Sequence, residues 1–279
     1  MTSHCPMNFA ISVTPPDADR LDAARAAGFT QVELPAWEGT PQDTGAHIRS
    51  LQTLLRDRRL RVAGVHAGWD LLDATKPSQL PGLIGRDIAY AAHFGAPVLV
   101  IHYSMFVEPA RLILDPAGKP HARETVDRDL IEWTPMLSKI RRDFAACVDQ
   151  ARRANVRIAL ETEVANSHRL LDFMTGADPA WCGVCFDTGH AQVDSDAGPL
   201  AEMLASRVIY AHIHDNTGKE DEHLPPGRGV IDWPRVLRAL RKARFTGPFT
   251  YEPIGWDAHL AADASKTLTA IWDAIGQGG

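Results

Sequence analysis

Residues 156–163 read VRIALETE, and residues 181–190 read WCGVCFDTGH. Each stretch is an apolar run of strand length that ends in acidic or imidazole side chains. A continuous apolar run of this kind is typical of a strand buried on both faces, as in a parallel sheet. The polar ends indicate where such a sheet would carry its chemistry, because the carboxyl ends of parallel strands meet at one edge.

The same pattern recurs along the chain. The eight strand candidates are residues 8–13, 31–37, 61–68, 97–104, 156–163, 181–190, 208–216 and 247–254. Segments with helical patterning lie between them, for example residues 17–28, 47–59, 136–155 and 233–245, and several end on Gly or Asn. This alternation predicts a parallel sheet, and eight units predict a single (β/α)8 TIM barrel that spans residues 1–279 as one domain. The alternative, a doubly wound open sheet, lacks the expected G-x-G-x-x-G or P-loop signature.

One connection breaks the alternation. Residues 105–135 form a long, mixed, proline-bearing stretch, with a turn expected at residues 115–118. We interpret it as a loop insertion that shapes the mouth of the site, since long connections after barrel strands often do so. A surface insertion without chemistry is the alternative.

Composition narrows the function classes. The chain has 279 residues, of which 45% are apolar and 23% charged, and a net charge of -6. An acidic chain is a poor match for a nucleic-acid backbone, and no apolar run is long enough to span a bilayer. Because no signal peptide is recognisable, we expect a cytoplasmic protein without membrane or nucleic-acid partners. Cys182 and Cys185 form a lone C-x-x-C inside a strand candidate, and we interpret both as small core residues.

Polar residues gather at the ends of the strand candidates. The residues are Glu33, His66, His102, Glu161, Glu163, Asp187, His190, His212, His214 and Glu252. Taken singly, each has a structural explanation as a hydrogen-bonded histidine, a helix cap or an ion pair. Taken together they indicate an active site, because barrel enzymes place their chemistry at the carboxyl ends of the strands.

Four of these residues make a plausible ligand set for one divalent metal ion: Glu161, Asp187, His212 and Glu252. Three carboxylates and one imidazole suit Mn2+, Mg2+ or Co2+, with Zn2+ as the less matched alternative. Without a cation, so many negative charges in one place would repel each other.

The strand-end motifs resemble those of the xylose-isomerase-like TIM barrels that include sugar phosphate isomerases and epimerases. The similar segments are VELPAW, IALETE, CFDTGHA, AHIHDNTGKEDEHLPPGRGVIDW and GPFTYEP, in this order over nearly the whole chain. The resemblance implies that Glu161, Asp187, His212 and Glu252 bind the metal ion. It favours His212 over His214, because the family ligand stands three residues before the acidic residue, here Asp215.

The resemblance also implies roles in catalysis and substrate binding. Glu161 and Glu252 would act as the acid/base pair, and His66 and His190 would hold hydroxyl groups or help to move protons. The chain departs from the family at Arg228, where a Glu is usual; Arg228 is either a contact for an anionic substrate group or a solvated loop residue.

The remaining expected substrate contacts are Glu33, Trp37, Trp69, His102, Arg228 and His223. Tyr103, Phe106 and Trp256 also stand near strand ends, and all the aromatic residues have core packing as the alternative.

The expected function is therefore metal-dependent isomerisation or epimerisation of a ketose or related polyhydroxy carbonyl compound through an enediolate. A lyase or dehydratase acting on a keto-inositol, keto-sugar or dehydroshikimate-like substrate begins with the same proton abstraction and is the runner-up. The metal-dependent apurinic endonuclease is a more distant alternative, with nine counterparts to its metal ligands: His66, His102, Glu161, Asp187, His190, His212, Asp221, His223 and Glu252. A barrel that only binds a ligand is disfavoured because both acid/base candidates are intact. A homo-oligomer is compatible with the sequence but not indicated by it.

Overall fold

The computed structural model describes residues 6–39, 41–71, 79–103, 126–164, 167–253 and 257–277. Its strands pair in parallel in chain order and close into a barrel, which confirms the predicted (β/α)8 fold. The strands are β1 (Asn8–Ser12), β2 (Gln31–Pro35), β3 (Arg61–Asp70), β4 (Val98–His102), β5 (Arg157–Glu161), β6 (Cys182–Asp187), β7 (Val208–Ile213) and β8 (Pro248–Tyr251).

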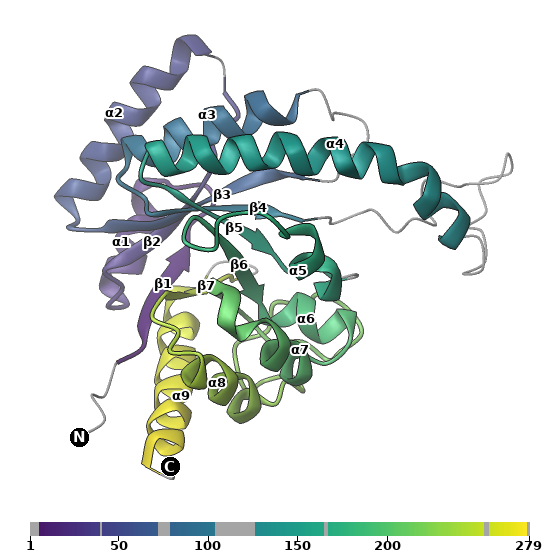
Figure 1. The fold of residues 1–279 in the computed structure, drawn as a ribbon. Helices are drawn as coiled ribbons and strands as arrows, with labels where there is room; N and C mark the ends of the chain where they lie inside the picture. The colour runs from purple at the N-terminus through teal and green to yellow at the C-terminus, as the bar shows by residue number, and fades with distance from the viewer. Residues whose placement is uncertain are drawn as a thin grey trace, which may run out of the picture.

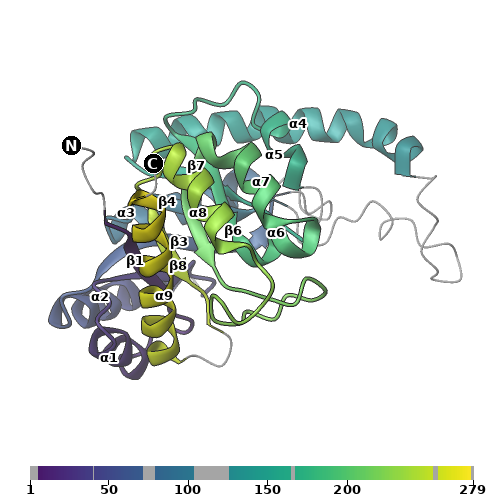
Figure 2. The same ribbon diagram turned by 90° about the horizontal axis from the view of Figure 1, so that it is seen from below.

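Helices surround the strands, as the two views in Figures 1 and 2 show. The α-helices are α1 (Ala18–Ala26), α2 (Pro41–Asp57), α3 (Leu80–His93), α4 (Val126–Arg153), α5 (Leu170–Phe173), α6 (Thr188–Asp194), α7 (Ala197–Leu204), α8 (Trp233–Lys242) and α9 (Ala258–Gln277). Two short 3-10 turns, η3 (Ser167–Arg169) and η4 (Ala205–Arg207), complete the connections among the described residues. No helix in this part of the chain combines the length and hydropathy needed to cross a bilayer.

Helix α4 corrects the expected extent of the long connection. It begins at Val126, not at Met136, and projects beyond the barrel in Figure 1. Apolar residues at positions 130, 133, 137, 140 and 144 keep helical spacing across Pro135, which explains why the helix extends through the proline. The rest of the predicted loop, including its turn at 115–118, lies outside the described residues.

The barrel interior is filled by small side chains around one large ring. Tyr210 is fully buried there, and Gly64 makes room for it, since a Cβ on Gly64 would lie 2.9 Å from the Tyr210 ring. Cys182 and Cys185 are free and buried, as their position in a strand predicted. A larger apolar layer packs between the strands and the helices.

Strand register brings the polar strand ends to one rim. His102 of β4 is opposite Glu161 of β5, and Asp187 of β6 is opposite His212 of β7. The β2–β3 register shifts between Val32 and Glu33, directly beside a polar strand-end residue. Such irregularities re-aim side chains and are frequent next to active sites.

Candidate active site

The carboxyl ends of β5 to β8 bring together Glu161, Asp187, His212 and Glu252. Each offers one ligand atom, and the four atoms lie within 4.8 Å of one another. The Nδ1 atom of His212 faces all three carboxylates, at 2.6 Å from Glu161 Oε1, 3.8 Å from Asp187 Oδ2 and 3.5 Å from Glu252 Oε1. This arrangement fits a divalent cation, because three acidic groups and one nitrogen converge on one small volume.

Glu33 fixes the ring of His212 from the opposite side. Its Oε2 lies 2.9 Å from His212 Nε2, and both side chains are fully buried. A carboxylate behind a histidine orients the ring and sets which nitrogen carries the proton. The position of Glu33 favours this orienting role over the contact with substrate that the sequence suggested.

His66 and His102 lie on the other side of Glu161. Their Nε2 atoms are 3.0 Å and 3.3 Å from Glu161 Oε2, and 3.0 Å from each other. The side chains of both histidines are partly exposed, at 17% and 14%, whereas Glu161 is fully buried. The imidazoles of His66 and His102 are therefore more accessible to solvent and to a substrate than Glu161 is.

The acidic and basic groups shift each other's protonation. Burial acts to lower the pKa of His66, but the neighbouring carboxylates of Glu161, Glu252 and Glu33 raise it to about 10. Burial acts to raise the pKa of Glu252, but His212 and His66 hold it well below its usual range. The protein alone therefore balances buried carboxylates with imidazolium charge, and a divalent ion would take the place of those protons.

Glu163, two positions beyond Glu161, is a polar residue whose importance the sequence only hinted at. It is buried, and among the described residues neither of its carboxylate oxygens accepts a hydrogen bond. Burial, together with the nearby charge of Glu161, raises the pKa of Glu163 to about 9. The two-residue spacing in ETE is the signal, because side chains two positions apart in an extended chain point to the same side.

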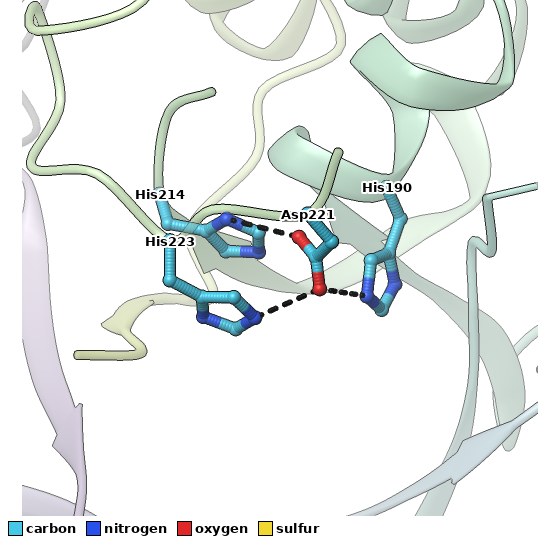
Figure 3. Close-up of side chains that lie close together, drawn as sticks. All are labelled: His190, His214, Asp221 and His223. Atoms are coloured by element: carbon cyan, nitrogen blue, oxygen red, sulfur yellow. Dashed lines mark hydrogen bonds and ion pairs between the residues drawn. The ribbon is translucent and has the colours of Figure 1, made fainter. Parts of the chain in front are cut away.

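Figure 3 shows a second group of polar side chains. It consists of His190 at the start of α6 and of His214, Asp221 and His223 in the loop after β7, and their ligand atoms also lie within 4.8 Å of one another. The group is joined to the first, because His214 Nε2 lies 3.0 Å from both oxygens of Asp187. The sequence favoured His212 over His214 as the metal ligand. In the structure His212 belongs to the first group, and His214 belongs to the second group together with His190 and His223.

Asp215 organises the loop that carries Asp221 and His223. Its carboxylate accepts hydrogen bonds from the backbone N–H groups of Asn216, Gly227 and Ile231 and from the indole of Trp233, at the start of α8. Its backbone also pairs with Leu224 in an isolated antiparallel bridge. This buried anchor explains how a long loop can hold two polar residues in place.

Three expected substrate contacts lie outside both groups. Trp37 stacks on His47 with ring centroids 3.8 Å apart, and Trp69 donates to Asp87, which lies in α3. Arg228 is exposed, and its guanidinium forms no ion pair with any residue that the structure describes. Of the other aromatic candidates, Tyr103 is a core residue packed against Phe173. Phe106 and Trp256 lie outside the described residues.

The strands form a closed parallel barrel, and carboxylates and imidazoles lie at their carboxyl ends. The protein is therefore a TIM barrel with a candidate metal centre. The chain belongs to the xylose isomerase-like TIM barrel family, whose model matches residues 21–271.

Individual proteins match parts of the chain. An uncharacterized protein, y4fM, from Sinorhizobium fredii is 29% identical over 177 residues, which cover 61% of this chain and 51% of that protein. The chain thus matches about half the length of this relative. L-ribulose-5-phosphate 3-epimerase UlaE of Salmonella paratyphi A is 26% identical over 110 residues, or 38% of this chain and 39% of that enzyme.

Solved structures share the fold. A D-tagatose 3-epimerase-like protein superposes with a TM-score of 0.73 at 20% identity, covering 97% of this chain and 99% of that chain. A xylose isomerase-like TIM barrel protein from Mycobacterium smegmatis, solved in complex with magnesium, gives a TM-score of 0.68 at 16% identity, with 96% and 97% covered.

Proposed function

We propose that the chain is a divalent-metal-dependent isomerase or epimerase of a ketose or a related polyhydroxy carbonyl compound. The observation that carries the proposal is the convergence of Glu161, Asp187, His212 and Glu252 within 4.8 Å at the mouth of the barrel. The similarity to sugar epimerases supports the same reaction class.

The four residues would hold one Mn2+, Mg2+ or Co2+ ion. When bound, such an ion polarises a carbonyl group and lowers the cost of removing the proton from the neighbouring carbon. The donor set fits these ions because it is rich in oxygen, and Zn2+ is a less matched occupant.

Two carboxylates, Glu161 and Glu252, would accept the substrate proton and return it. The Glu252 side chain is 13% exposed, whereas Glu161 is fully buried, so Glu252 is the better placed to take a proton from a small substrate. Return of the proton to the opposite face of the enediolate gives an epimer, and return to the adjacent carbon gives an aldose–ketose isomer.

The histidines at the rim would hold the substrate. His66 lies 3.6 Å from Glu252 Oε1 and 3.0 Å from Glu161 Oε2, between the two acid/base candidates. His66 is placed to hydrogen-bond a substrate hydroxyl while either carboxylate accepts the proton. His102 lies next to His66 and would bind the substrate on the same side.

The test is proton exchange in deuterated water. Purified protein with saturating Mn2+ is incubated with a panel of ketoses, and NMR follows deuterium at single carbon positions. Glu252→Gln should abolish exchange because the amide cannot accept the proton, whereas Glu202→Gln, at a surface carboxylate paired with Arg235, should leave exchange intact. Exchange at the normal rate in Glu252→Gln would remove its assigned role.

The same samples distinguish isomerisation from the alternative reaction, elimination. Elimination by a lyase or dehydratase loses water, which mass spectrometry of the products detects, whereas isomerisation keeps the mass. Arg228, which the sequence suggested as a contact for an anionic substrate group, is exposed and lies outside both side-chain groups.

A hydrolase of phosphodiesters is a second candidate because of one specific observation. The nine counterparts named from the sequence all fall within three of the groups that could hold a metal ion. Cleavage of abasic DNA by the metal-loaded protein, sensitive to salt, would support it. Intact DNA alongside ketose exchange would eliminate it.

A further inference from the structure

A pocket lies at the amino ends of β2 and β3, at the opposite end of these strands from the candidate active site. Its walls come from the first residues of the two strands, Gln31 and Arg61, and from the last turns of α2 and α3, at Arg56 and His93. The pocket has a volume of about 470 Å³. Small-molecule sites typically have volumes of about 300–1,000 Å³, so the pocket is large enough for a small organic ligand.

The side chains that line the pocket are positively charged, although the whole chain has a net charge of -6. Arg56, Arg61 and His93 are among them, and none of the described lining residues is an Asp or a Glu. Arg61 forms no ion pair with any residue that the structure describes. Arg56 Nε lies 3.5 Å from Asp57 Oδ1, but the two side chains are 73% and 59% exposed, so solvent screens this pair. Most of the guanidinium charge at the pocket is therefore available to a ligand.

Both helices end at the pocket with backbone carbonyls that are already paired. At the end of α2 the carbonyls of Leu55 and Arg56 accept the N–H groups of Leu60 and Arg59, and Arg59 has the left-handed φ of 54° that is typical of such an ending. Helix α3 ends in the same way at Gly95, with a φ of 63°. A basic side chain in the last turn often serves to pair such carbonyls. Here the backbone already does so, and the basic side chains are not needed as caps.

The helix dipoles do not reverse the charge of the pocket. The carboxyl end of a helix carries about half a negative elementary charge, so two helix ends contribute about one. Arg56 and Arg61 each contribute a full positive charge that does not depend on pH in the ordinary range. The two guanidinium groups outweigh the helix ends, and the pocket favours an anion.

The buried part of the pocket is apolar. Leu55, Leu60 and Val62 line it and are only 5%, 6% and 7% exposed, whereas Arg56 and Arg61 are exposed. A ligand would therefore place an apolar part against the buried side chains and its charge beside the arginines. The planar guanidinium fork matches the oxygens of a carboxylate or a phosphate group.

We propose that this pocket binds a small organic oxyanion. The apolar body of the ligand packs on Leu55, Leu60 and Val62, and its phosphate or carboxylate group lies at Arg56 and Arg61. The pocket is separate from the candidate active site, because one lies at the amino ends and the other at the carboxyl ends of the strands. Binding at the pocket requires neither a metal ion nor a sugar.

Phenyl phosphate is the probe, because it joins one aromatic ring to one phosphate group. Full-length protein, treated with a chelator, is titrated with phenyl phosphate, and isothermal titration calorimetry gives the Kd. Arg61→Gln and Arg56→Gln should each weaken binding about 10-fold, since each removes a charged hydrogen-bond donor. Arg153→Gln is the matched control, because Arg153 is an exposed arginine in the last turn of α4 and does not line the pocket. It should leave the Kd unchanged.

Further probes test the two parts of the ligand. Inorganic phosphate lacks the apolar body and benzyl alcohol lacks the charge, so each should bind about 10-fold more weakly than phenyl phosphate, or less tightly still. Benzoate carries a carboxylate in place of the phosphate and should also lose affinity in Arg61→Gln. The tighter of benzoate and phenyl phosphate identifies the oxyanion that the pocket prefers.

The proposal fails if no saturable binding of phenyl phosphate or benzoate is measured, or if the Kd is the same in both arginine variants and the unmodified protein. Crystals soaked in phenyl phosphate provide an independent test. Density for the ring and phosphate between α2 and α3 supports the site, and density only at the carboxyl ends of the strands overturns it. Because the proton-exchange test of the proposed function does not involve this pocket, either proposal can fail while the other stands.

Discussion

Glu33→Leu removes the carboxylate that fixes the ring of His212. The two groups are 2.9 Å apart and fully buried, so water cannot take over the hydrogen bond without a cavity. Loss of such an outer partner costs about 10- to 100-fold in metal affinity. This corresponds to about 1.4–2.8 kcal/mol of binding free energy.

A second variant separates charge from shape. Glu33→Gln keeps an acceptor oxygen for His212 Nε2 but loses the negative charge, so we expect a Kd about 10-fold weaker, near the lower end of the range for an outer partner. Glu33→Leu should approach the upper end. Titration of metal-free protein with Mn2+, with free Mn2+ followed by electron paramagnetic resonance, gives both values.

Glu202→Gln is the control, because it neutralises a surface carboxylate that pairs with Arg235 and belongs to none of the candidate ligand groups. Thermal unfolding of each metal-free variant verifies that the barrel is intact. If Kd is unchanged in both Glu33 variants, the orienting role is refuted, and with it the argument that His212 Nδ1 is the metal-facing atom.

The remaining predictions concern stability. Gly189→Ala should lower the free energy of unfolding by about 1–3 kcal/mol in urea titrations, because the new Cβ would overlap His214; an unchanged midpoint would show that the ring is free to move. Asp215→Asn weakens four hydrogen bonds to a charged acceptor and should cost about 2 kcal/mol, a fall in Tm of about 4–8 °C; Asp263→Asn, on the surface of α9, should leave Tm unchanged. Mn2+ at 100 times its Kd should stabilise the protein by about 2.7 kcal/mol over the chelator-treated form in scanning calorimetry, and equal stability of the two forms would contradict a metal site in the folded barrel.

The fold could be predicted because two short-range signals agree. Apolar runs of strand length alternate with helical spacing, and the chain can satisfy both only in a closed or open parallel sheet. The start of α4 was harder to predict, because Pro135 suggests an end to helical structure. Apolar spacing on both sides of the proline was the better guide.

The residues of the candidate site were predictable, but their pairings were not. Strand alternation predicts that His212 and His214 point to the same side, and nothing in HIHD says that one faces Glu161 and the other Asp221. Trp37 and Trp69 follow strand ends, yet their indole N–H groups reach Thr44 of α2 and Asp87 of α3. Position at a strand end fixes where a side chain starts, whereas its direction depends on partners far away in sequence.

Asp187 shows why these pairings matter for function. Its Oδ1 accepts the His190 backbone N–H at 2.7 Å and so begins α6, its Oδ2 lies 3.8 Å from His212 Nδ1, and both oxygens contact His214. One carboxylate therefore links the helix that carries His190 to both groups of polar side chains. Because residues in a shared network do not contribute additively, the free-energy cost of changing Asp187 together with His212 or His214 should differ from the sum of the separate costs.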